Sequence, residues 1–128
     1  MLKSILAVIV AVIVWFVVAT IGNFVLRLLL PGYSAVEVAM TFTLTMMLCR
    51  LLLGLVSSLV AGFVCGLITG PSSLAPKVAA GILLILFIPV HYMLWDKFPI
   101  WYHLFFLLTL APTVLLGAAL QGRKAGTP

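Results

Sequence analysis

The amino-acid sequence predicts an all-α integral membrane protein, in which four transmembrane helices form an antiparallel bundle with short loops. Two observations lead to this prediction. Of the 128 residues, 66% are hydrophobic and only 7% are charged, whereas a soluble domain has about 25% charged residues. At about 20 apolar residues for each crossing, the chain has room for four crossings in a single membrane domain. A soluble globular domain and a disordered chain are both excluded.

The first predicted helix covers residues 4–26, an apolar run that ends before Pro31-Gly32. The apolar core of a secretory signal has only about 7–15 residues, so we interpret this run as a retained transmembrane helix. The second helix is predicted over residues 40–68. Its apolar run is too long for a hydrocarbon core of about 30 Å. The segment Thr41–Thr45, polar at every second position, is therefore expected to lie outside that core.

The third and fourth helices are predicted over residues 77–94 and 98–120, with a polar tail at 121–128. Because all loops are short, both termini are expected on one side of the membrane. That side carries four basic residues, and the other carries two: Lys3, Lys77, Arg123 and Lys124 against Arg27 and Lys97. Since Lys and Arg concentrate in cytoplasmic loops, the sequence predicts a cytoplasmic-membrane protein with both termini in the cytoplasm.

The net charge of +5 comes from basic residues that are scattered along the chain and form no patch. The expected partner is therefore the lipid bilayer and not a nucleic acid. Cys49 and Cys65 lie sixteen residues apart on one predicted helix, or about 24 Å, so they cannot form a disulfide bond with each other. No CxxC or CxxxH spacing is present, and no metal or other cofactor is predicted.

Small residues recur at every fourth position of the second predicted helix: Gly54, Ser58, Gly62, Gly66 and Gly70. Residues with this spacing share one helix face and form a shallow groove. In a bilayer, such grooves let two helix backbones approach closely. The sequence predicts a tight helix contact here. The partner helix belongs either to the same chain or to another chain, in a homo-oligomer or with a partner membrane protein.

Arg50 is the one charged residue inside an apolar run, where an arginine costs at least about 2.5 kcal/mol at the bilayer centre. Three interpretations remain open. The side chain can extend to the membrane interface, it can form an ion pair with Glu37 or Asp96, or it can bind an anionic lipid head group or solute.

His91 and His103 lie six residues on either side of Lys97, so a hairpin would place them at the same depth near the outer interface. Both are expected either to form interfacial hydrogen bonds or to share one outward-facing site, with Asp96 as an acidic neighbour. Zinc would need further ligands. A haem within one hairpin is disfavoured because packed helices lie only about 8–10 Å apart. Asn23 adds to a gathering of polar residues toward the outer leaflet.

The sequence predicts a membrane subunit or scaffold that packs through the groove of the second helix. The alternative is a homo-oligomeric transporter of small solutes or ions with an outer-leaflet polar site. A lipid-modifying enzyme or a haem- or metal-binding protein ranks third, because no GxSxG or HExxH motif is present and no catalytic residue is predicted. In size and helix number the chain resembles small multidrug transporters and fluoride channels. The acidic residue that the former carry in the first helix is absent here, so the resemblance implies architecture alone.

Overall fold

The computed structural model describes residues 2–30, 32–37, 42–70 and 74–126. Within these ranges all regular structure is helical, and four helices are long and apolar enough to cross a membrane. They are α1 (Leu2–Leu29), α3 (Leu44–Thr69), α4 (Ala75–Met93) and α5 (Ile100–Gly126). The predicted all-α class and the four apolar helices are confirmed.

Capping explains where α3 begins and ends. It begins at Leu44, because the Thr43 hydroxyl accepts a hydrogen bond from the Met46 amide at 3.3 Å. The helix was predicted to begin at residue 40. Residues 42 and 43 precede it without being helical, and residues 40 and 41 lie outside the described part of the chain. At the other end, Gly70 has a φ of 92° and donates its amide to the Gly66 carbonyl at 2.8 Å. Only glycine adopts this conformation readily, so Gly70 ends the helix.

Two helical segments were not predicted. A five-residue helix, α2 (Tyr33–Glu37), follows Gly32, whose φ of 78° turns the chain after α1. In addition, α5 continues to Gly126, beyond the apolar run that ends at residue 120. The added segment is Gln-Gly-Arg-Lys-Ala-Gly. Four of its residues favour helix and its two glycines do not, so apolarity alone did not predict this end of α5.

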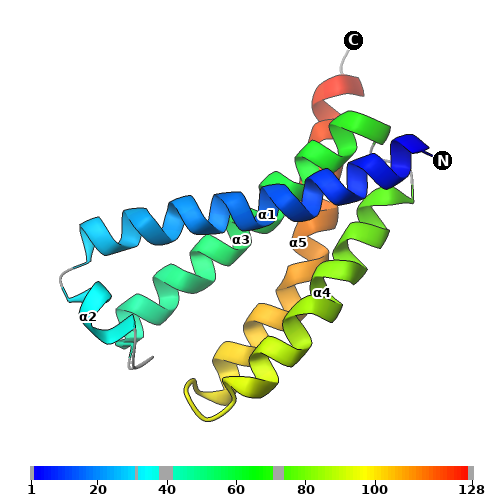
Figure 1. The fold of residues 1–128 in the computed structure, drawn as a ribbon. Helices are drawn as coiled ribbons and strands as arrows, with labels where there is room; N and C mark the ends of the chain where they lie inside the picture. The colour runs from blue at the N-terminus through cyan, green and yellow to red at the C-terminus, as the bar shows by residue number, and fades with distance from the viewer. Residues whose placement is uncertain (1, 31, 38–41, 71–73, 127–128) are drawn as a thin grey trace.

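In Figure 1, α3 lies at the centre and the two chain termini lie at the same end of the molecule. The most extensive contacts of α3 are with α5 and α1, and α4 packs along α5. Toward the other end, which carries α2 and the turn at residues 94–99, α1 diverges from α4 and α5 (Figure 1). We call this the splayed end.

The contact between α3 and α5 joins main chain to main chain. A Cβ atom at Gly62 would overlap the main chain of Val114, and one at Gly117 would overlap that of Leu59. Alanines supply much of the remaining core: Ala7, Ala11, Ala61, Ala75, Ala79, Ala80 and Ala118. Such small residues are typical of helix contacts in lipid, where close packing replaces the hydrophobic effect as the source of association.

The groove of small residues on α3 is covered by the chain's own helices. Gly62 and Gly66 face α5, at Val114 and Ala118 respectively, and Gly54 faces the ring of Phe106. Ser58 is buried and accepts a hydrogen bond from the Trp15 indole at 3.0 Å. The geometry therefore favours the within-chain interpretation of the groove. A partner helix docking there, as the predicted scaffold role requires, would have to displace α5 or α1.

Candidate ligand-binding pocket

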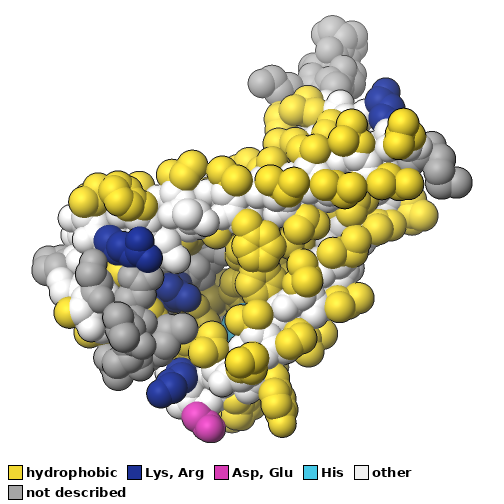
Figure 2. Space-filling view, viewed as in Figure 1, with side chains coloured by type: hydrophobic (Ala, Val, Ile, Leu, Met, Phe, Trp, Pro, Cys, Tyr) yellow, Lys and Arg dark blue, Asp and Glu magenta, His cyan; other side chains and the backbone are white. Residues whose placement is uncertain are grey.

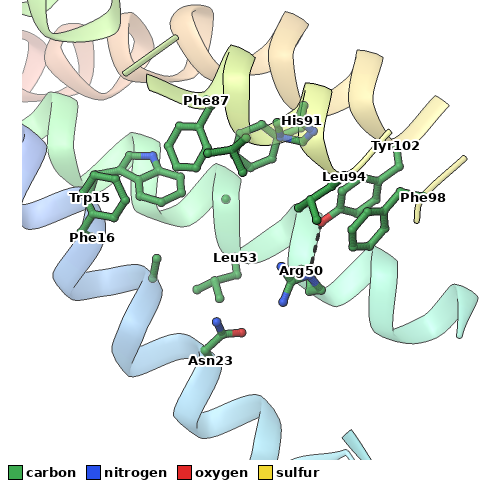
Figure 3. A pocket seen from close by; sticks show the side chains of 14 residues that line it. Trp15, Phe16, Asn23, Arg50, Leu53, Phe87, His91, Leu94, Phe98 and Tyr102 are labelled. Carbon is green, nitrogen blue, oxygen red and sulfur yellow. Dashed lines mark hydrogen bonds between the residues drawn. The ribbon is translucent and has the colours of Figure 1, made fainter. Parts of the chain in front are cut away.

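A cavity of about 170 Å³ lies toward the splayed end and is lined by all four long helices. A cavity of about 150 Å³ is large enough for benzene. Figure 3 shows the residues that line it, and Figure 2 shows that the surface between α1 and α4 is hollowed there. Most of the wall is apolar, including Trp15, Phe16, Leu53, Phe87 and Phe106. The polar groups come from Asn23, Arg50, His91 and Tyr102.

Arg50 is held in the cavity wall by two tyrosines. Its Nε donates to the Tyr102 hydroxyl at 3.3 Å, and one terminal nitrogen donates to the Tyr33 hydroxyl at 2.8 Å. The Tyr33 hydroxyl in turn donates a hydrogen bond to Asn23 Oδ1 at 3.0 Å. Tyr33 and Tyr102 are both buried. The guanidinium is therefore directed into the cavity (Figure 3), where it lies among groups from α1, α3 and α5.

Two aromatic rings add to the stabilisation of Arg50. Its Cζ lies 4.6 Å from the ring centroid of Phe42 and 5.9 Å from that of Phe98, and these rings stack on each other at 5.7 Å. A hydrogen bond to a charged group contributes about 1.5–3 kcal/mol, and a cation–π contact contributes about 0.5–2 kcal/mol. Together these contacts offset the cost of burying the arginine among apolar groups.

No described carboxylate forms an ion pair with Arg50. Asp96, one of the two acids considered as a partner of Arg50, is exposed and forms no ion pair with it. The side chain of Glu37, the other acid considered, lies outside the described part of the chain. The acceptors that hold the guanidinium are therefore neutral hydroxyls, and they leave its positive charge uncompensated by any described acid.

His91 and His103 meet at the splayed end, as α4 ends and α5 begins. Their Nδ1 atoms lie 2.7 Å apart, and both side chains are buried. The other ring nitrogen of His103, Nε2, lies 3.3 Å from the Trp95 carbonyl oxygen, and the Trp95 ring stacks on His103 at 4.8 Å. The group that His103 meets in the turn is therefore a main-chain carbonyl and not the carboxylate of Asp96.

The distance between the Nδ1 atoms of His91 and His103 is that of a hydrogen bond, and it is too short for two ligands of one metal ion. Two nitrogens on one tetrahedral zinc ion would lie about 3.3 Å apart, given bonds of about 2.0–2.1 Å, and here the distance is 2.7 Å. The described residues contain no group of three or more His, Cys, Asp or Glu side chains placed to hold a metal ion. A haem between the two rings would require them to separate, since they now contact each other.

The residues that position Arg50 could not be identified from the sequence. Tyr33 follows Gly32, and its burial depends on how α2 folds back. Tyr102 lies fifty-two residues after Arg50 in the sequence, and no spacing pattern links the two. The only available signal was the coincidence of one buried arginine with tyrosines at the same predicted depth. Asn23, by contrast, was identified from its position in the outer half of the first helix.

Most of the hydrogen-bonding groups in the pocket that lack a described partner are donors. Arg50 keeps further N–H groups, Asn23 keeps its amide NH₂, and the Tyr102 hydroxyl proton has no acceptor among the residues that the structure describes. Donors that converge beside a positive charge suit an anionic oxygen. Comparisons of the chain with protein-family models, with curated proteins and with solved structures found no match.

Proposed function

We propose that this protein binds the anionic head of an amphiphile, which enters its pocket sideways from the bilayer and pairs with Arg50. The observation that carries the proposal is the Arg50 guanidinium. It lines an apolar cavity, is oriented by two neutral hydroxyls, and has no described carboxylate as partner. A charge in such surroundings is costly unless it is paired. An anionic ligand would supply the missing pair.

The shape of the pocket supports an amphiphile over a fully soluble anion. A volume of about 170 Å³ accommodates a carboxylate or phosphate with only a few carbons. The remaining chain can leave through the hollow between α1 and α4 and stay among the lipid tails (Figure 2). Phe16 and Val90 line the cavity and are partly exposed, so an alkyl chain would meet an apolar surface there.

We also propose an orientation in the membrane. The four helices cross in alternating directions, and both termini lie in the cytoplasm. Four of the six basic residues near helix ends belong to the end of the molecule that carries the termini, and Lys and Arg concentrate on the cytoplasmic side of membranes. The pocket then lies in the half of the bilayer away from the cytoplasm. This role requires no second copy and no partner helix, in keeping with a groove that α5 already fills.

Trp15 offers a direct measurement, since it lines the pocket. In a Trp95→Phe/Trp101→Phe protein, Trp15 is the one remaining tryptophan of three. Its fluorescence is titrated with a fatty acid brominated along the chain and with the methyl ester of that acid. The acid should bind at least about tenfold more tightly, which corresponds to about 1.4 kcal/mol. Arg50→Gln should remove this advantage.

Lys97→Gln is the matched control, because Lys97 is exposed at the same end and loses the same charge. It should keep the preference for the acid. Equal binding of acid and ester by the wild-type pocket would refute the proposal, as would equal losses in Arg50→Gln and Lys97→Gln. Arg50→Lys keeps the positive charge but carries all its donors on one nitrogen, whereas Arg50 uses two. It should therefore keep part of the affinity for the acid, and it provides a second test if Arg50→Gln folds poorly.

A further inference from the structure

The hydrogen-bond polarity of the His91–His103 pair indicates a second group on the ligand. The main-chain carbonyl of Trp95 lies 3.3 Å from His103 Nε2 and can only accept a hydrogen bond. His103 Nε2 therefore carries a proton and donates it. In a neutral imidazole the other nitrogen then has no proton, so His103 Nδ1 is an acceptor.

The contact between the rings sets the state of His91. Because His103 Nδ1 accepts, the proton in the 2.7 Å contact belongs to His91 Nδ1. In the neutral ring, His91 Nε2 is then left with a lone pair and no proton. The turn between α4 and α5 thus fixes, through two hydrogen bonds, which ring nitrogen of His91 carries the proton.

His91 Nε2 is open to the cavity. It forms no hydrogen bond with any residue in the described ranges. Among the described residues, the one fully buried side-chain polar atom without a hydrogen-bond partner is Gln121 Oε1. His91 Nε2 also has no partner, so it cannot be fully buried. Because His91 is largely buried and lines the pocket, its Nε2 atom is accessible from the pocket. An otherwise donor-rich pocket thus holds one unoccupied acceptor.

Resting on the proposed function, we infer that the anionic head retains one acidic hydroxyl, as the monoanion of a phosphate or phosphonate monoester does. Arg50 pairs with an anionic oxygen of this head, and His91 Nε2 accepts the hydrogen bond from its O–H group. Both residues adjoin Tyr102. The Tyr102 hydroxyl holds Arg50, and the Tyr102 ring centroid lies 6.2 Å from that of His91. One tetrahedral head group beside Tyr102 would meet both.

The test compares two alkyl anions of equal chain length and equal charge in the Trp15-only protein: a brominated alkylphosphonate and a brominated alkanesulfonate. At a mildly acidic pH the phosphonate keeps one proton and the sulfonate has none. The phosphonate should bind about tenfold more tightly, the size of one hydrogen bond. His91→Phe should abolish this preference, so that the phosphonate and the sulfonate bind equally. Tyr92→Phe, at an exposed neighbour, should keep it.

Nitrogen-15 NMR of the histidine side chains tests the same inference without a variant. The unliganded wild-type protein at neutral pH should show a proton on His91 Nδ1 and none on His91 Nε2. A proton on His91 Nε2 in that state would overturn the inference. Equal binding of phosphonate and sulfonate would also overturn it, while the pairing of Arg50 with anions would stand. If neither anion binds, the proposed function fails as well.

Discussion

The main-chain carbonyl of Val114 occupies the space that a Cβ atom on Gly62 would need. The same relationship recurs in reverse, since Leu59 carbonyl lies where a Cβ on Gly117 would stand. α3 and α5 thus interlock through their backbones, and neither helix can accept a side chain at these points without moving away from the other.

We expect Gly62→Ala to destabilise the protein by about 1–3 kcal/mol, the usual cost of overpacking a tight contact. The displaced group is main chain, which cannot rotate aside as a side chain would. Thermal unfolding in detergent, followed by circular dichroism, measures the effect. Gly81→Ala is the control, because a Cβ there meets nothing within 4 Å. Equal melting temperatures for the two variants would show that α3 and α5 are not in this contact.

Ser58→Ala should destabilise the protein by about 1–3 kcal/mol, because it leaves the buried Trp15 indole N–H without its acceptor at 3.0 Å. Ser57 is equally buried but bonds only to the Leu53 carbonyl of its own helix. Ser57→Ala should therefore cost less. A double-mutant cycle with Trp15→Phe isolates the pair, and a coupling energy of zero would contradict the hydrogen bond.

Tyr33→Phe removes the hydroxyl that joins Arg50 to Asn23. The guanidinium loses its shorter described hydrogen bond, so we expect a loss of about 1.5–3 kcal/mol in unfolding free energy. Chemical denaturation measures it. Tyr92→Phe should change little, since Tyr92 is 82% exposed. A wild-type unfolding midpoint for Tyr33→Phe would mean that Arg50 is held by other groups.

Membrane orientation can be measured directly. Reporters active only outside the cytoplasm, fused separately after the C-terminus and within the turn at residues 94–99, should be silent at the first position and active at the second. Active reporters at both positions would contradict the four-crossing topology. The reverse pattern would keep four crossings but place the pocket in the cytoplasmic half.

Apolarity made the helices predictable from sequence, because each crossing must satisfy its own backbone in lipid and no other regular structure does so within one segment. The row from Gly54 to Gly66 predicted a close contact without identifying its partner, because a four-residue period defines a face and says nothing about what covers it. Only the structure shows α5, through Val114 and Gly117, in that place.

The pocket was less predictable because it depends on side chains from distant segments. Arg50 and Asn23 were identified as isolated polar residues, yet the link between them runs through Tyr33 on the unpredicted helix α2. The symmetry of His91 and His103 about Lys97 predicted equal depth. It did not predict that their Nδ1 atoms would meet at 2.7 Å, since that depends on ring orientation and on the Trp95 carbonyl.

The hollow between α1 and α4 has a consequence for how affinity should be expressed. An amphiphile that enters through it, as we propose, comes from the membrane phase, so its relevant concentration is its mole fraction among the lipids. Each added methylene favours transfer from water to the bilayer by about 0.8 kcal/mol. Affinity referred to the aqueous concentration should therefore rise steeply with chain length, whereas affinity referred to mole fraction should stay nearly constant. Occupancy of the pocket would then follow the composition of the bilayer and not the solubility of the ligand in water.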